Sequence, residues 1–153
     1  MALGIGDSAP DFDLETANGR VRRQDFVGKP YVIYFYPKDD TPGCTKEAIG
    51  FSCLASEFAN AGVTVIGISP DNTKSHEKFR VKHELSVTLA SDPEHQLMEA
   101  FGVWVEKSMY GRTYMGVERA TFLIGADGRI AAAWPKVKVD GHAEAVLAAA
   151  KAL

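Results

Sequence analysis

The chain has 153 residues, with 17 Lys and Arg against 20 Asp and Glu, a formal net charge of -3 and two cysteines. This length predicts one domain, 1–153, that buries roughly 70% of the surface its unfolded chain exposes. The sequence has no basic run and no apolar stretch approaching about 18 residues, which argues against nucleic acid and membrane partners. The N-terminus does not resemble a signal peptide, so we expect a cytoplasmic protein whose cysteines are catalytic, metal-binding or inert.

The first half of the chain alternates between apolar runs and an amphipathic segment. Residues 31–36, "YVIYFY", form a continuous aromatic and β-branched run, typical of a strand covered on both faces. Residues 44–62 predict a helix, with Ile49, Leu54 and Phe58 recurring at near-helical spacing. Residues 63–69 predict a second buried strand. Because a helix lies between the two strands, we expect them to be parallel.

The second half predicts further elements of a mixed sheet. Residues 72–85 have the pattern of an amphipathic helix, and residues 120–134 predict two strands around the turn Asp127-Gly128. Residues 140–153 form an Ala-rich helix. This order predicts an α/β fold of the thioredoxin-like type, with a mixed central sheet flanked by helices.

Cys44 follows a Thr-Pro-Gly turn and opens a predicted helix. Unpaired backbone N–H groups and the positive end of the helix dipole meet there and favour a thiolate, although a small residue at a helix start is the alternative. Thr41 could hydrogen-bond the thiolate or an oxygen-bearing substrate, or cap the helix. Pro37 could wall off a pocket at the strand exit, and Glu47 could orient a cation over the site or favour the helix dipole.

The segment "PKDDTPGC" has the pattern P-x-x-x-T-x-x-C and resembles the active-site motif of the peroxiredoxins. The segments "GDSAPDFDLE", "VIGISPD", "SDPEHQLMEAFGVW" and "ERATFLIGADGRI" are similar to the bacterioferritin comigratory protein, or peroxiredoxin Q, branch of that family. The resemblance implies that Cys44 is the peroxidatic cysteine, Thr41 its hydroxyl partner and Pro37 the shield of the pocket. It also implies that Arg119 faces the thiolate, a choice that spacing alone does not make over Arg112 or Arg129.

The sequence departs from the branch at the resolving cysteine. Many members have it five residues after the peroxidatic cysteine, where this chain has Ile49, and the other site used in the branch lies in "KFRVKHEL", which contains no cysteine. Cys53 is therefore either a resolving cysteine or a small buried hydrophobe. On a continuous helix Cys53 would lie about 13 Å further along the axis than Cys44 and roughly on the opposite face, so a disulfide would require unwinding. The spacing of the two cysteines does not match a zinc site.

Aromatic and histidine side chains outside the motif have simpler expected roles. We expect Trp104, Tyr110 and Tyr114 to pack under the loop beside the active site, with lining of the approach for larger hydroperoxides as the alternative. The four histidines are scattered, and we expect each to be exposed or hydrogen-bonded: His76, His83, His95 and His142.

The resemblance implies a thiol peroxidase that reduces hydrogen peroxide and organic hydroperoxides. Cys44 would become a sulfenic acid and return to the thiol through an external dithiol, either thioredoxin or a glutathione and glutaredoxin system. No metal or organic cofactor is expected, and the resemblance favours a monomer. The alternative is a peroxide-sensing or redox-regulated binding module in which Cys44 is oxidised once. A disulfide reductase is disfavoured because the chain has no C-x-x-C pair.

Overall fold

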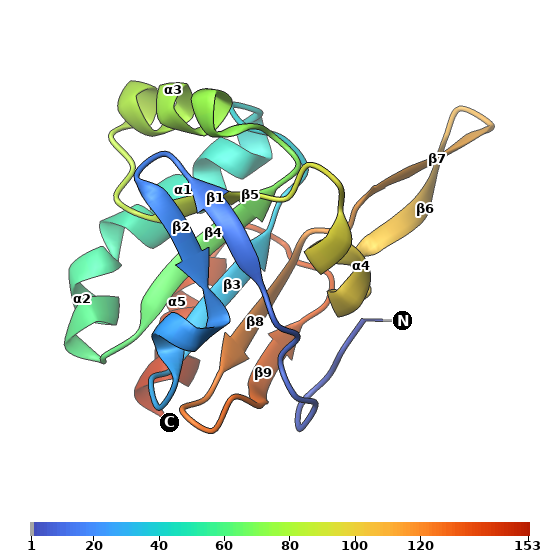
Figure 1. The fold of residues 1–153 in the computed structure, drawn as a ribbon. Helices are drawn as coiled ribbons and strands as arrows, with labels where there is room; N and C mark the ends of the chain where they lie inside the picture. Colours follow the sequence, from blue (N-terminus) through green and yellow to red (C-terminus); the bar gives the residue numbers. More distant parts are fainter. Residues whose placement is uncertain (1) are drawn as a thin grey trace.

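The computed structural model describes residues 2–153 and contains a seven-stranded mixed sheet with the strand order β2-β1-β5-β4-β3-β8-β9 (Figure 1). A separate two-stranded ribbon is formed by β6 and β7. The strands are β1 (Asp13–Thr16), β2 (Gly19–Arg22), β3 (Tyr31–Phe35), β4 (Thr64–Ser69), β5 (Thr88–Ser91), β6 (Trp104–Met109), β7 (Arg112–Val117), β8 (Ala120–Ile124) and β9 (Ile130–Trp134).

The centre of the sheet is β3, which is buried along its whole length. It pairs in parallel with β4 and antiparallel with β8, so Val32 lies between Val65 and Leu123. The predicted parallel pair and the hairpin formed by β8 and β9 are both confirmed. At the turn of that hairpin Gly128 has a φ of 80°, a left-handed conformation that glycine adopts without steric cost. The α/β fold with a mixed central sheet is therefore the one that the sequence predicts.

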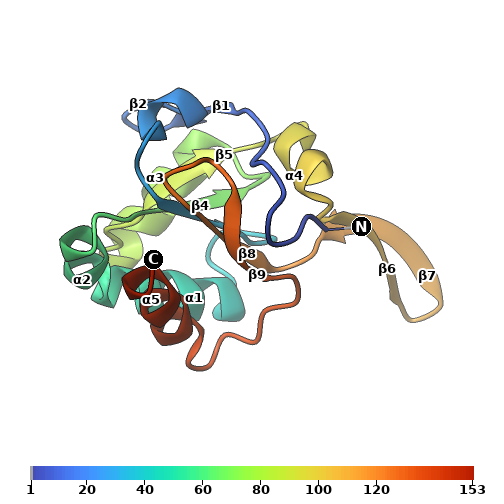
Figure 2. The same cartoon turned by 90° about the horizontal axis from the view of Figure 1, so that it is seen from below.

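Helices cover both faces of the sheet (Figure 2). One face packs against side chains of α1, α2, α3 and α5, and the other packs against α4 and the segment before β1. No helix within residues 2–153 has the length and apolar character needed to cross a bilayer. The helices are α1 (Pro42–Cys53), α2 (Ala55–Asn60), α3 (Thr73–His83), α4 (Gln96–Phe101) and α5 (His142–Lys151), and a 3-10 helix, η1, spans Arg23–Phe26.

The helix predicted over residues 44–62 is two helices. Leu54, with φ -101° and ψ 8°, separates α1 from α2. Phe58 is buried, whereas Ile49 is 40% exposed. The expectation that Ile49 faces the core together with Phe58 was therefore wrong, because α1 buries Cys44, Ala48 and Phe51 and Ile49 lies off that face.

The ribbon formed by β6 and β7 extends away from the rest of the molecule (Figures 1 and 2). Tyr110 at its turn is 97% exposed and Tyr114 is 45% exposed, whereas Trp104 at its base stacks on His95 with a ring separation of 3.6 Å. The predicted packing of these three aromatic residues in one cluster was wrong. The aromatic and glycine residues of this segment are part of a hairpin. Its turn residues, Tyr110 and Gly111, have positive φ values.

Candidate active site

Cys44 is the third residue of α1 and is only 1% exposed. The loop of residues 37–41 leads from β3 to this helix, so the cysteine lies just beyond the end of the central strand. Its side chain belongs to the apolar cluster beneath the helix together with Tyr34, Ala48 and Phe51. A thiol at a helix start is thus held in a nearly closed, largely apolar environment.

Arg119 reaches the cysteine from a distant part of the chain. Its Nη2 donates a hydrogen bond to Cys44 Sγ at 3.3 Å, and its Nη1 donates to Glu47 Oε1 at 2.7 Å. The antiparallel register of β3 and β8 sets Ala120 opposite Phe35, which places the preceding residue, Arg119, beside the strand exit. One guanidinium group therefore holds the sulfur and the carboxylate of the same helix.

The carboxyl group of Glu47 lies next to this guanidinium and is almost fully buried. Burial raises its pKa to about 7, and the charge and hydrogen bond of Arg119 only partly oppose this effect. Glu47 Oε2 has no hydrogen-bond partner within residues 2–153. Burial lowers the pKa of Arg119, but the charges of Glu47 and Cys44 outweigh burial and hold that pKa above its ordinary value. The cation over Cys44 therefore stays charged.

Gly43 allows the guanidinium to approach the helix. A Cβ atom at this position would lie 3.2 Å from Arg119 Nη2 and 3.8 Å from its Cζ. Sequence reasoning did not identify Gly43 as part of the site. Its position between Pro42 and Cys44 was visible in the sequence, but the residue that passes over it was not.

Thr41 and Pro37 both lie in the loop that precedes α1. Thr41 is the N-cap residue of α1, yet its side chain makes no capping hydrogen bond, and its hydroxyl donates instead to the carbonyl of Lys38 at 2.9 Å. The capping role considered for Thr41 was therefore wrong. Pro37 is partly buried in the loop after β3. Both residues lie within seven positions of Cys44, in the loop that leads from β3 to the start of the helix.

The two cysteines are free, and they differ in environment. Cys53 is the last residue of α1 and is exposed. Because α1 is continuous from Pro42 to Cys53, the prediction that residues 44–53 are helical is confirmed, and the two sulfurs belong to opposite faces of the helix. The alternative of a buried hydrophobe is contradicted for Cys53 by its exposure. The solvent-facing side of α1 instead carries Ile49 and a shallow groove lined by Asp40, Pro42, Thr45, Lys46 and Ile49.

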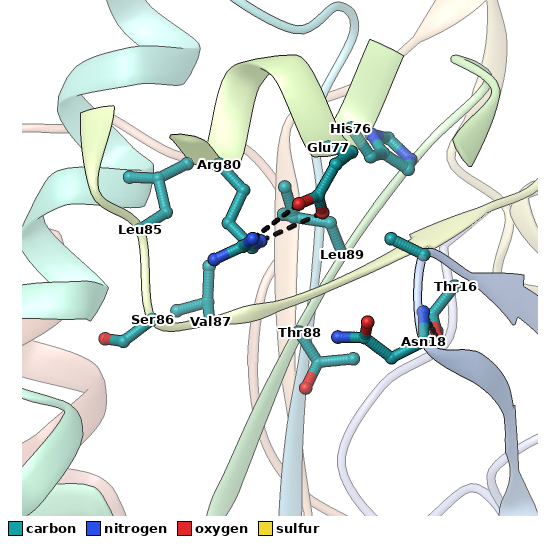
Figure 3. A pocket seen from close by; sticks show the side chains of 11 residues that line it. Thr16, Asn18, His76, Glu77, Arg80, Leu85, Ser86, Val87, Thr88 and Leu89 are labelled. Atoms are coloured by element: carbon teal, nitrogen blue, oxygen red, sulfur yellow. Dashed lines mark hydrogen bonds and ion pairs between the residues drawn. The ribbon is translucent and has the colours of Figure 1, made fainter. Parts of the chain in front are cut away.

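A pocket of about 300 Å³ lies between α3, β5 and the turn that joins β1 to β2 (Figure 3). Arg80, from the segment "KFRVKHEL", lies along this pocket and makes a two-point ion pair with Glu77 of the same helix. None of the lining residues comes from the loop of residues 37–41 or from α1. The segment that the resemblance gave as the other site of a resolving cysteine therefore carries an ion-paired arginine in this chain.

Two histidines expected to be exposed or hydrogen-bonded are buried and hydrogen-bonded. His142 Nε2 lies 2.8 Å from Thr121 Oγ1, and its pKa is lowered to about 4, first by burial and then by the charge of Arg119. His76 contacts Asp39, in the loop before Cys44. Sequence reasoning missed the connection between His76 and this loop because the two residues are 37 positions apart.

Known proteins share this fold and sequence over nearly the whole chain. The AhpC/TSA family matches residues 5–133. Peroxiredoxin Bcp of Bacillus subtilis is 48% identical over 143 residues, covering 93% of this chain and 91% of its own length. The structure of Xylella fastidiosa PrxQ in a cysteine-to-serine variant has a TM-score of 0.93 at 40% identity, covering 99% of this chain and 98% of that one.

A structure of Xanthomonas campestris bacterioferritin comigratory protein has a TM-score of 0.88 at 46% identity, covering 92% of this chain and 90% of that one. That protein was studied for alkyl peroxide reduction, with trapped intermediate and ligand complexes. A buried cysteine at a helix start beneath an arginine, on a thioredoxin-like sheet, defines a thiol peroxidase of the peroxiredoxin class. The chain belongs to the AhpC/TSA family, in its bacterioferritin comigratory protein or peroxiredoxin Q branch.

Proposed function

We propose that Cys44 is the peroxidatic cysteine of this enzyme and that it reduces hydrogen peroxide and organic hydroperoxides. The observation that carries the proposal is the guanidinium of Arg119, which donates to Cys44 Sγ at 3.3 Å while it is anchored on Glu47. A fixed cation beside the sulfur stabilises the thiolate, which is the nucleophilic form of cysteine.

The reaction displaces one peroxide oxygen from the other. The Cys44 thiolate attacks the terminal oxygen of the hydroperoxide, a sulfur–oxygen bond forms and the oxygen–oxygen bond breaks. Sulfur is oxidised to a sulfenic acid, and the leaving hydroxide or alkoxide takes a proton from solvent to become water or an alcohol. Because negative charge develops on the leaving oxygen, a positioned donor such as Arg119 contributes a few kcal/mol of transition-state stabilisation.

The other residues of the site support this step. Glu47 accepts a hydrogen bond from Nη1 of Arg119 and so orients the guanidinium group over Cys44. We assign Thr41 the role of hydroxyl partner for the peroxide, since its oxygen keeps lone pairs after donating to Lys38. Pro37, which follows the central strand, shields the pocket from water.

The sulfenic acid must be reduced for a second turnover. We propose an external dithiol, thioredoxin or a glutathione and glutaredoxin system, as the reductant of a monomeric enzyme in a reducing compartment such as the cytoplasm. The study of the Xanthomonas relative supports alkyl hydroperoxides as one substrate class. Cys53 is exposed and can act as a conditional resolving cysteine only if α1 unwinds.

Peroxide consumption in excess dithiol, followed together with the intact mass of the protein, tests this function. We expect many turnovers per protein, and in the absence of dithiol a mass increase of one oxygen located on Cys44. Consumption that stops after one equivalent of peroxide would replace the peroxidase with a sensor. An oxygen found only on Cys53 would remove Cys44 from the reaction.

A further inference from the structure

A buried polar cluster fastens the loop before Cys44 to α3 and β5. Asp39, in the middle of that loop, is only 7% exposed. Its carboxylate accepts hydrogen bonds from Tyr36 Oη at 2.6 Å and Ser75 Oγ at 2.8 Å, and it lies 2.7 Å from His76 Nδ1. The backbone N–H of Asp39 donates to Asp71 Oδ2 at 2.8 Å. The loop is thus held by Tyr36, which follows β3, and by the segment of residues 71–76.

The hydrogen-bond partners of His76 determine where its protons lie. Its Nε2 is 3.1 Å from the carbonyl oxygen of Ala90, which can only accept, so Nε2 carries a proton. Its Nδ1 is 2.7 Å from Asp39 Oδ2, a distance at which one of the two atoms must also carry a proton.

The groups around the pair favour the ring over the carboxyl group as the position of that second proton. The carboxylate of Asp39 already accepts from two hydroxyl groups, which favours its ionised form. The carboxyl group of Asp71 lies close enough for Asp39, Asp71 and His76 to present ligand atoms within 4.8 Å of one another, and a second negative charge further favours a positive ring. Titratable groups close to His76 include Asp39, Asp71 and Tyr36, whose hydroxyl is 3.3 Å from Nδ1. Glu77 and Arg80 of the same helix line the pocket that His76 also lines.

We propose that Asp39 and doubly protonated His76 form a buried ion pair that positions the loop of residues 37–41 and, through it, the first turn of α1 that carries Cys44. Neither residue touches the sulfur, so both are positioning residues. This proposal rests on the proposed role of Cys44 in peroxide reduction. A buried ion pair holds the loop firmly against α3. Breaking the pair would leave an uncompensated charge in the interior, so a loosened loop has a higher free energy.

The protonation of His76 is measured directly by NMR of the ring nitrogens in protein labelled at histidine. We expect both nitrogens of His76 to have imidazolium shifts. The partly buried rings of His83, which contacts Asp40, and of His95, which stacks on Trp104, serve as internal comparisons. A neutral His76 ring with an unprotonated Nδ1 would overturn the ion pair, whatever the enzymatic results. This measurement uses the unmodified protein and does not depend on the role of Cys44.

The positioning role is tested with Asp39→Asn, His76→Asn and the double variant. We expect each single variant to oxidise Cys44 with peroxide roughly tenfold to a hundredfold more slowly, as for a small misplacement of reacting groups. The double variant should be no slower than the slower single variant, because the two residues act as one unit. The matched control is Asp40→Asn, which removes the same charge from the same loop but breaks only exposed contacts with Lys82 and His83. It should change the rate less than about threefold.

The rate of Cys44 alkylation distinguishes a misplaced first turn of α1 from an unfolded protein. Loosening the first turn should speed alkylation of Cys44 by iodoacetamide, because the sulfur is 1% exposed in the parent protein. A slower peroxide reaction together with faster alkylation, in protein that is more than nine-tenths folded by circular dichroism, supports positioning. An unchanged peroxide rate in a folded single variant overturns it while leaving the proposed chemistry of Cys44 intact. If the variants do not fold, the ring-nitrogen measurement still decides the ion pair.

Discussion

The two ends of α1 carry the two cysteines of the chain in opposite environments. At the first turn Cys44 is 1% exposed and touches Arg119, a residue 75 positions away. At the last turn Cys53 is exposed and lies at the break between α1 and α2. The same residue type on the same helix thus has a charged partner in one place and solvent in the other.

The difference shows what a reactive thiol requires beyond a cysteine. Low exposure alone would disfavour an ionised sulfur, and exposure alone would leave it an ordinary thiol. At Cys44 a cation and a helix start lie beside the sulfur, and Glu47 fixes the cation. Cys53 lies at the C-terminal end of the helix, where the helix dipole has the opposite sign.

The largest expected effect comes from replacing the buried cysteine. Cys44→Ser keeps nearly the same size but cannot form a thiolate, so peroxide turnover should be lost while the circular dichroism spectrum stays that of the parent. Peroxide consumption in excess dithiol measures the outcome. Turnover near the parent rate would mean that the buried end of α1 is not the reactive one.

Removing the cation should make Cys44 behave more like Cys53. Arg119→Met keeps much of the side-chain stem but deletes the charge that faces the sulfur. We expect peroxide to react more slowly by roughly one to several orders of magnitude, and the ultraviolet absorbance of the thiolate to appear at higher pH. Arg112→Met, in the exposed ribbon, is the control. An unchanged thiolate titration in Arg119→Met would remove the arginine from the site.

Crowding the guanidinium group of Arg119 should have a smaller effect on the rate of the peroxide reaction. A Cβ atom in Gly43→Ala would lie 3.2 Å from Arg119 Nη2, so the guanidinium must shift by a few tenths of an ångström. We expect a peroxide rate lower by about threefold to tenfold. Gly50→Ala on the same helix is the matched control, because its Cβ would meet only Ala143 Cβ at 3.4 Å. Equal rates in the two variants would show that the approach over Gly43 is not critical.

The buried carboxyl group should make stability depend on pH. Because the pKa of Glu47 is raised to about 7 from 4.5, the folded protein binds its proton more tightly than the unfolded chain does. Stability from this group is therefore full below about pH 4.5 and falls as the pH rises toward 7, by about 1.4 kcal/mol per unit at most. Glu47→Gln should remove this contribution in urea unfolding measured across that range.

Two comparisons isolate the Glu47 contribution. His142, whose pKa is lowered to about 4, contributes the opposite slope below pH 6.5 in both proteins, and its effect cancels in the difference. Glu57→Gln, which changes an exposed carboxylate near Lys151, should leave the slope of the parent unchanged. Parallel pH profiles for the parent and Glu47→Gln would contradict the raised pKa.

The smallest expected effect is at the exposed end of the helix. Cys53→Ser should leave the rate of the first oxidation of Cys44 within about twofold, since Cys53 contributes nothing to the stabilisation of the thiolate. Non-reducing peptide mapping after one equivalent of peroxide gives the second result. We predict a Cys44–Cys53 crosslink only in protein whose α1 has locally unwound, because the helix separates the two residues by about 13 Å along its axis and places them on opposite faces. Sulfenic or sulfinic acid at Cys44 beside a free Cys53 would instead show that the enzyme depends wholly on outside thiols.

Local patterns in the sequence determined the elements and the motif. The run "YVIYFY" specified a strand buried on both faces, and the Asp127-Gly128 turn specified the β8–β9 hairpin, because each depends on residues adjacent in the chain. The segment from Pro37 to Cys44 likewise placed a cysteine at a helix start. These features could be predicted since strand burial, turn geometry and helix initiation are set over a few residues.

Only the tertiary structure decided which residues complete the site. The antiparallel register of β3 and β8 selects Arg119, and its guanidinium joins Glu47 to Cys44. The packing of α1 against the sheet leaves Ile49 exposed, and the packing of α3 against the loop brings His76 to Asp39. Each of these features depends on how segments far apart in the sequence pack against one another. A periodic pattern records which face of one element is apolar, but it contains no information on which distant side chain that element meets.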